Sequence, residues 1–177
     1  MPHMMMPNAS HDEQASQNFV LNLKEHISRE ITPGHHPLYR RTVLPSFLSA
    51  KGHPPTNRHQ LRKAMERTTY HQCWSSLMRL GQELMWESVQ NSVDRQLDEL
   101  CQRAKILTPF GSLQLDPDLP QPRYLASVDQ HGQPGGYHTD CGGNDVRAGA
   151  VLDRGAFLYH FGKSGGGMLD ARGKTLV

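Results

Sequence analysis

Apolar residues recur at spacings of three and four along much of the chain, which is typical of amphipathic helices. The first such run covers residues 12–31, and four apolar side chains form its stripe: Phe19, Val20, Leu23 and Ile27. This run predicts a helix that "TPG" at 32–34 ends, because proline and glycine interrupt helices. Residues 35–56 contain four prolines and predict a connection with a single helical turn at "VLPSFL".

Two further helical runs follow. Asn57 is expected to cap the first, because an asparagine side chain accepts hydrogen bonds from the free N–H groups at a helix start. The two threonines of "RTTY" weaken that helix at its end. The strongest periodicity predicts one long amphipathic helix over residues 73–104, with a polar gap at Ser88 and Asn91 that marks a bend or a polar contact. Its expected apolar stripe is Cys73, Leu77, Leu80, Leu84, Val93, Leu97, Leu100 and Ala104.

The second half of the chain is richer in glycine and proline. "RYLASV" at 123–128 predicts a short extended segment before a glycine-rich loop. A helix is expected from Asn144 or Asp145 to Tyr159, and its apolar residues on two sides indicate that it is buried. The last run, "MLDARGKTLV", predicts the start of another helix that stops on apolar residues, so we expect the chain to be the front part of a longer protein.

These runs predict a mainly α chain with one long amphipathic helix, a Gly/Pro-rich loop section, and room for one or two short strands. The expected organisation is a disordered tail over residues 1–12, a helical region over 13–108, and the loop section over 109–145. A buried helix and the start of a truncated helix then occupy 146–177. A content of 36% hydrophobic residues, with 16 Gly and 12 Pro, predicts a thin core for 177 residues.

Charge and cysteine content exclude several classes of protein. A formal net charge of +2 is too small to indicate a nucleic-acid partner or an anionic membrane surface. The three cysteines are widely spaced and odd in number, unlike a disulfide framework, and we expect Cys73 and Cys101 to be buried as small apolar groups. No signal peptide or membrane span is evident, so the sequence favours a soluble, cytoplasmic protein.

The loop over residues 128–146 carries the candidate chemistry. His131, His138 and Cys141 are spaced H-x6-H-x2-C, with Asp140 as a candidate fourth ligand, but structural zinc sites normally use a tighter pair. We therefore predict no metal site and expect hydrogen-bonded or solvent-facing loop side chains. Cys141 and His138 also have the residue types of a nucleophile and its base, without a third group to orient them. "GKS" at 162–164 lacks the glycine of a phosphate-binding loop, since Phe157 occupies that position.

Several segments together resemble one family. "PRYLASVD", "PGGYHTD" and "DVRAGAVLDRGAFLY" are similar to the region upstream of the catalytic core in bacterial class I S-adenosylmethionine-dependent methyltransferases. "FVLNLKEHISRE", "VLPSF" and "CWSSLMRLGQELMWESV" resemble the helical front part of the same proteins.

The resemblance implies a helical accessory region followed by a Rossmann-like catalytic domain, of which neither the glycine-rich turn nor the acidic strand end occurs here. S-adenosylmethionine is then the cofactor of the full-length protein, and none is expected bound to this chain. The implied partners are an unknown methyl acceptor and the chain's own C-terminal catalytic domain. Tyr137 and His138 are the candidate substrate contacts, and no catalytic or cofactor-binding residue is assigned.

Two other hypotheses remain open. The chain could be a stand-alone, non-enzymatic helical module that binds a partner through its long helix. It could also be a small metal-binding protein built on His131, His138 and Cys141. Apolar surface left uncovered by a truncated helix would promote self-association.

Overall fold

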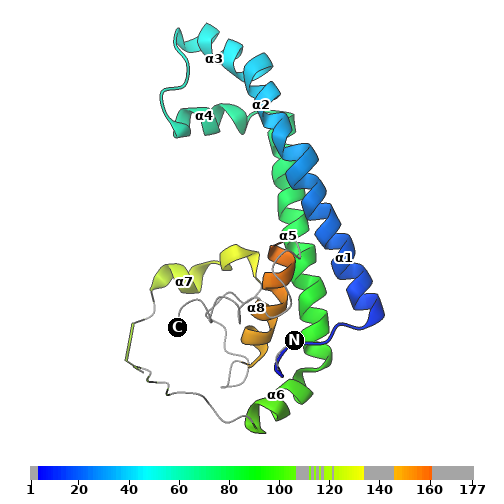
Figure 1. Ribbon diagram of the computed structural model, residues 1–177. Coiled ribbons are helices and arrows are strands. Elements are labelled where there is room, and N and C mark those ends of the chain that lie inside the picture. The colour runs from blue at the N-terminus through cyan, green and yellow to red at the C-terminus, as the bar shows by residue number, and fades with distance from the viewer. Residues whose placement is uncertain are drawn as a thin grey trace. The chain divides into compact units, whose positions relative to one another are not determined.

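The computed structural model describes residues 4–106, 112, 114, 116, 118–120, 122–133 and 146–160, and this part of the chain is helical, with no strand. The prediction of a mainly α protein is therefore confirmed. The helices, drawn in Figure 1, are α1 (His11–His26), α2 (His35–Leu38), α3 (Leu44–Lys51), α4 (Arg58–Met65), α5 (Thr69–Arg95), α6 (Leu97–Ile106), α7 (Arg123–Ser127) and α8 (Val146–Tyr159).

The chain divides into two compact units. Unit 1 comprises Met1–Leu21 and Gln82–Val177, and unit 2 comprises Asn22–Gly81. The helices α1 and α5 each contribute residues to both units. Each unit is described by itself below.

The core of unit 1 forms where α5 meets α1, α6 and α8. One face of α5 supplies Met85, Trp86, Val89 and Val93, all at most 2% exposed. Around this face gather Val20 of α1, Leu100 of α6, and Ala150, Val151 and Leu158 of α8. This arrangement confirms a buried helix up to Tyr159, while its expected caps, Asn144 and Asp145, lie outside the described residues.

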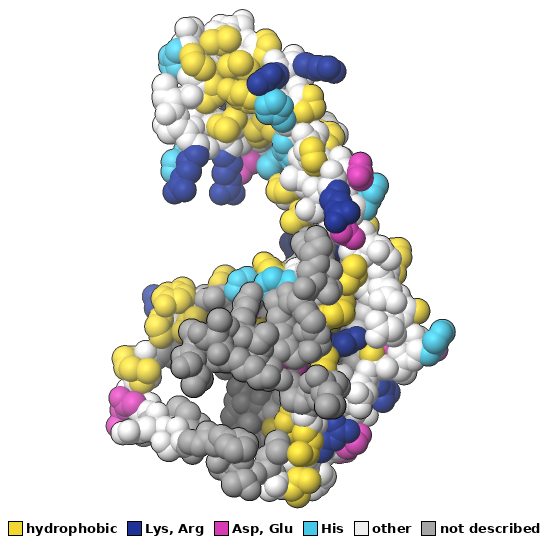
Figure 2. All heavy atoms as spheres, in the orientation of Figure 1, with side chains coloured by type: hydrophobic (Ala, Val, Ile, Leu, Met, Phe, Trp, Pro, Cys, Tyr) yellow, Lys and Arg dark blue, Asp and Glu magenta, His cyan; other side chains and the backbone are white. Residues whose placement is uncertain are grey.

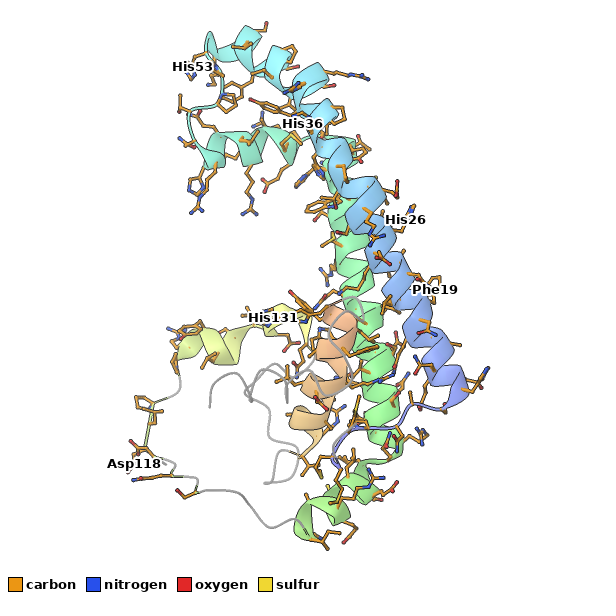
Figure 3. All side chains as sticks on the ribbon, viewed as in Figure 1. Phe19, His26, His36, His53, Asp118 and His131 are labelled. Carbon is orange, nitrogen blue, oxygen red and sulfur yellow. The ribbon has the colours of Figure 1, made fainter. Side chains whose placement is uncertain are left out.

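The apolar stripe predicted for the long helix is wrong in its first half and confirmed at Val93 and Leu100, which are both fully buried. Leu80 is 44% exposed and Cys73 is exposed, whereas the buried face runs through Met85 and Val89. Phe19 of the first predicted stripe is 62% exposed and projects outward from α1 in Figure 3. Periodicity identifies a helix, but the helices that pack against it determine which face is buried.

Polar side chains interrupt the long helix at a different place from the one predicted. α5 continues through Ser88 and Asn91, and the Ser88 carbonyl instead accepts a hydrogen bond from Gln17 Nε2 at 3.2 Å. The predicted polar contact is thus present at Ser88, and the predicted bend is not. The break comes at Gln96, between α5 and α6, where the Gln96 amide bonds the carbonyls of Asn8 and Ser92.

The N-terminal segment has more contacts than its composition led us to expect. Pro7 is fully buried, and Asn8 exchanges hydrogen bonds with Gln96 in both directions, at 3.0 and 2.9 Å. Arg95 Nη2 donates to the Asn8 carbonyl at 2.7 Å. These bonds hold residues 4–10 beside the junction of α5 and α6, and the mobility of the tail in solution stays a prediction.

In unit 2 the helical backbone does not end at "TPG", contrary to the prediction. A π-helical turn over Ile27–Ile31 and a 3₁₀ turn over Thr32–Gly34 lead into α2, and a second π-helical turn, Tyr39–Val43, leads into α3. Pro33 stands in the first turn of the 3₁₀ segment, where its missing N–H is not needed. The Thr32 hydroxyl satisfies the carbonyl of Ile27 at 2.9 Å. The helical path ends instead at Gly52, whose φ of 74° is left-handed.

The second predicted helix is confirmed as α4. Asn57 Oδ1 accepts hydrogen bonds from the N–H groups of His59 and Gln60 at 3.1 and 3.0 Å, as a capping residue should. The interruption at "RTTY" is also present, because α4 ends at Met65 and α5 begins at Thr69.

The predicted extended segment at 123–128 is wrong, because residues Arg123–Ser127 form α7. Pro122 precedes it with φ −60° and ψ 135°, and its carbonyl accepts the Leu125 N–H at 2.9 Å. One turn of helix is too short for its apolar pattern to differ from that of a strand. Within the part of the chain that the structure describes, no helix is long and apolar enough to cross a membrane.

Candidate functional site

Most of the predicted loop residues lie outside the described part of the chain, namely Tyr137, His138, Asp140 and Cys141. His131 is described, and its carbonyl bonds two side chains of α5. The His131 carbonyl accepts hydrogen bonds from Trp86 Nε1 at 3.0 Å and from Gln82 Nε2 at 2.6 Å. The described residues contain no group of three or more His, Cys, Asp or Glu placed to hold a metal ion.

Unit 2 contains a groove of about 660 Å³ that sequence reasoning missed. One wall is the α3 side, where Val43, Phe47 and Ala50 follow a spacing of four and three. The opposite wall is α4 with Ala64. Val43 is buried at 5% exposure and forms the floor. In Figure 2 hydrophobic side chains gather over this end of unit 2.

The rim of the groove is cationic. Lys51, Lys63 and Arg67 line it and are exposed. Among the described residues none of the three forms an ion pair. His53 also lines the groove, and its ring meets the Phe47 ring edge-on at 6.2 Å. The groove therefore combines an apolar floor with unpaired positive charge at its edges.

The charge of the chain is unevenly distributed, which its total conceals. Unit 2 contains ten Lys and Arg against three Asp and Glu, a formal charge of +7, and the rest of the chain has nine against fourteen, a formal charge of −5. Residues 31–65 contain no acidic residue. Counting charge segment by segment would have revealed this asymmetry in the sequence, whereas the net charge of +2 conceals it.

A hydrogen-bonded histidine pair lies where α2 meets α5 in unit 2. Nδ1 of His35 lies 2.9 Å from the Thr32 carbonyl, and its Nε2 lies 3.1 Å from Nδ1 of His71. Trp74 packs edge-on against His35 at 4.7 Å, and its Nε1 donates to the Thr32 hydroxyl at 2.9 Å. The cluster joins two segments 36 residues apart, and its bonds fix both imidazoles.

A second hollow, of about 610 Å³, opens beside this cluster. His71 and Trp74 line one side and Arg62 another, with the Arg62 guanidinium paired to Glu66 at 2.5 Å. Because its charged groups are already paired with each other, this hollow offers less to a charged ligand than the groove does.

In unit 1 the buried polar groups form a structural network. Arg154 of α8 donates through Nε to Gln17 Oε1 at 2.9 Å, and Gln17 Nε2 donates to Ser92 Oγ at 2.9 Å. Burial lowers the pKa of Arg154 from its usual value, and the nearby carboxylates of Asp153 and Glu13 oppose that shift. Arginine remains charged in proteins, so the network solvates a buried cation.

Glu13 and Lys24 are two more described groups whose pKa values are shifted. The hydrogen bonds from Arg95, at 2.7 and 2.8 Å, hold the pKa of Glu13 at about 2, although desolvation acts in the opposite direction. Burial lowers the pKa of Lys24 to about 8. Neither shift belongs to the groove.

Comparison with known proteins returns no match: no family model fits the chain, and no curated protein or solved structure is significantly similar to it.

Proposed function

We propose that this chain is the helical accessory region of a bacterial S-adenosylmethionine-dependent methyltransferase that acts in the cytoplasm. The observation that carries the proposal is the resemblance of "PRYLASVD", "PGGYHTD" and "DVRAGAVLDRGAFLY" to the region before the catalytic core of that family. The helical architecture of the described residues supports it, because a helical front part is what the resemblance implies.

In this proposal the helices cover one side of a catalytic domain that follows them. S-adenosylmethionine supplies an electrophilic methyl group, and the enzyme contributes mainly alignment of an acceptor nucleophile with it. This chain contributes binding surface, with Tyr137 and His138 of the "PGGYH" loop as substrate contacts near the entrance. The chemical class of the acceptor remains open.

Calorimetric titration tests the proposal. S-adenosylmethionine should give no heat of binding with these 177 residues, and it should bind a chain extended into the coding sequence after Val177. That coding sequence should encode a strand followed by a glycine-rich turn. Binding to the 177-residue chain alone would contradict the placement of the cofactor site, and a downstream sequence without that strand and turn would contradict the family.

The groove of unit 2 favours a second candidate function, that of a non-enzymatic helical module that binds a protein partner. The groove has an apolar floor at Val43 and Phe47 and a cationic rim. These are features of a binding surface, and they do not require catalytic residues. Partner binding through the groove is itself compatible with an accessory region, so it does not separate the two functions. They differ in whether S-adenosylmethionine binds the extended chain.

A further inference from the structure

The two walls of the groove present side chains at helical spacing. On the α3 side, Val43, Phe47 and Ala50 lie four and three residues apart. On α4 the lining residues Gln60 and Ala64 lie four apart, and Arg67 lines the groove from the turn after that helix. Figure 1 shows α3 and α4 as the two arms of a helical hairpin joined by a loop. A trough between two helices accepts a third helix whose apolar side chains follow the same period.

The positive charges around the trough favour a partner with negative charge. Lys51 belongs to α3, Lys63 to α4, and Arg67 to the turn that follows α4. No acidic residue lies between Glu30 and Glu66, so nothing in that stretch neutralises the rim. A partner that carries carboxylates beside its apolar residues would satisfy floor and rim together.

The apolar floor of the groove argues against a nucleic-acid partner. Nucleic-acid surfaces combine cations with stacking aromatic or polar groups that reach bases and phosphates. Here the lining includes the aliphatic side chains of Val43 and Ala64, and Phe47 is half-buried with its ring already against His53. An apolar floor of this kind fits side chains such as leucine.

We infer that the α3–α4 groove binds an amphipathic helix of a partner protein that is apolar along one face and acidic on both flanks. Its apolar side chains, at positions i, i+3 or i+4 and i+7, pack on Val43, Phe47 and Ala64. Its carboxylates pair with Lys51 on one side and with Lys63 and Arg67 on the other. The inference deepens the interaction role proposed above and does not depend on a methyltransferase activity.

The test uses the full 177-residue chain and a fluorescein-labelled designed peptide. The peptide has about 15 residues, or about 22 Å of helix, with leucines at the stated spacing and glutamates on both flanks. Fluorescence anisotropy should show saturable binding that weakens as salt is added, because exposed charges are screened. A peptide with glutamine for glutamate and one with alanine for leucine should each bind at least about tenfold more weakly, or about 1.4 kcal/mol.

Charge reversal locates the binding site. The variant Lys63→Glu/Arg67→Glu should weaken binding about tenfold. The matched control Arg40→Glu/Arg58→Glu makes the same change in net charge on unit 2 at residues that do not line the groove, and it should bind almost as the parent does. Circular dichroism of both variants establishes that each remains helical. Equal weakening by the two variants would overturn the assignment of the site to the groove.

Other occupants are distinguished by parallel probes. Two probes are a single-stranded RNA of about 15 nucleotides and vesicles that contain phosphatidylserine. Binding of either one in place of the peptide would overturn the inference. Sedimentation velocity tests a second copy of this chain, and a dimer that Lys63→Glu/Arg67→Glu dissociates would likewise overturn it. None of these measurements involves S-adenosylmethionine, so their failure is separate from that of the methyltransferase proposal.

Discussion

Nε2 of His35 lies 3.1 Å from Nδ1 of His71, while Nδ1 of His35 lies 2.9 Å from the carbonyl oxygen of Thr32. A carbonyl only accepts hydrogen bonds, so the proton of a neutral His35 is on Nδ1 and its Nε2 is an acceptor. His71 must then donate through Nδ1. One backbone carbonyl thereby determines the tautomers of two histidines.

Both imidazoles are therefore expected in the Nδ1–H form when they are neutral. Nitrogen-15 long-range correlation NMR of the histidine side chains reads the tautomer directly. Replacing His35 by alanine should lower the free energy of unfolding of unit 2 by about 1–2 kcal/mol, because hydrogen bonds of this kind contribute about that much. An Nε2–H tautomer at His71 would contradict the arrangement.

The buried cation of Arg154 makes a second prediction. Gln17→Leu should destabilise the protein by about 2–3 kcal/mol, because it removes the oxygen that accepts hydrogen bonds from a buried charge. The double variant Gln17→Leu/Arg154→Met should recover much of that loss, since it removes the charge as well. Urea unfolding of the two single variants and the double variant measures the coupling, and strictly additive losses would argue against the network.

Stability in acid should depend on Glu13. Its pKa is about 2 in the folded protein against a usual 4.5, because Arg95 binds the carboxylate. The folded state thus holds fewer protons than the unfolded state between these values, so the contribution is present above about pH 4.5 and is lost as the pH falls towards 2. Thermal unfolding at a series of pH values should show this fall.

Glu13→Gln should reduce this fall in stability in acid, because the substituted side chain does not titrate. Glu30→Gln, at an exposed acid in unit 2, is the matched control, and the protein should still lose stability in acid as the parent does. An unchanged slope in Glu13→Gln would show that the Arg95 pair does not form in solution.

The sequence predicted the helices better than their faces and ends. Asn57 was identified as a cap because that role depends on residues only two and three positions away. The end at "TPG" was wrong because Pro33 fits a first helical turn as well as it ends a helix, and the choice depends on Tyr70, whose hydroxyl bonds the Ile31 carbonyl from 39 residues away. Such distant partners have no signature in a local pattern.

The groove and the polar network were missed for different reasons. Hydropathy places Gln17 and Arg154 on the surface, yet both are buried because each satisfies the other. The cationic rim was present in the sequence but hidden in a net charge that sums two units of opposite sign. Only the fold shows that Phe47 and Ala64 share one hollow.

Two glycines of α8 provide a matched pair for the packing of unit 1. A methyl group at Gly155 would come within 3.0 Å of Trp86 Cη2 and closer still to Cζ3, in a core where the indole is 2% exposed. Gly155→Ala should therefore destabilise by about 1–3 kcal/mol through overpacking. Nothing lies within 4 Å of a methyl group at Gly149, and Gly149→Ala should stabilise by about 0.5–1 kcal/mol, because alanine favours helix. Urea unfolding with tryptophan fluorescence as the signal measures both, and equal effects of the two substitutions would show that α8 does not pack on Trp86 through Gly155.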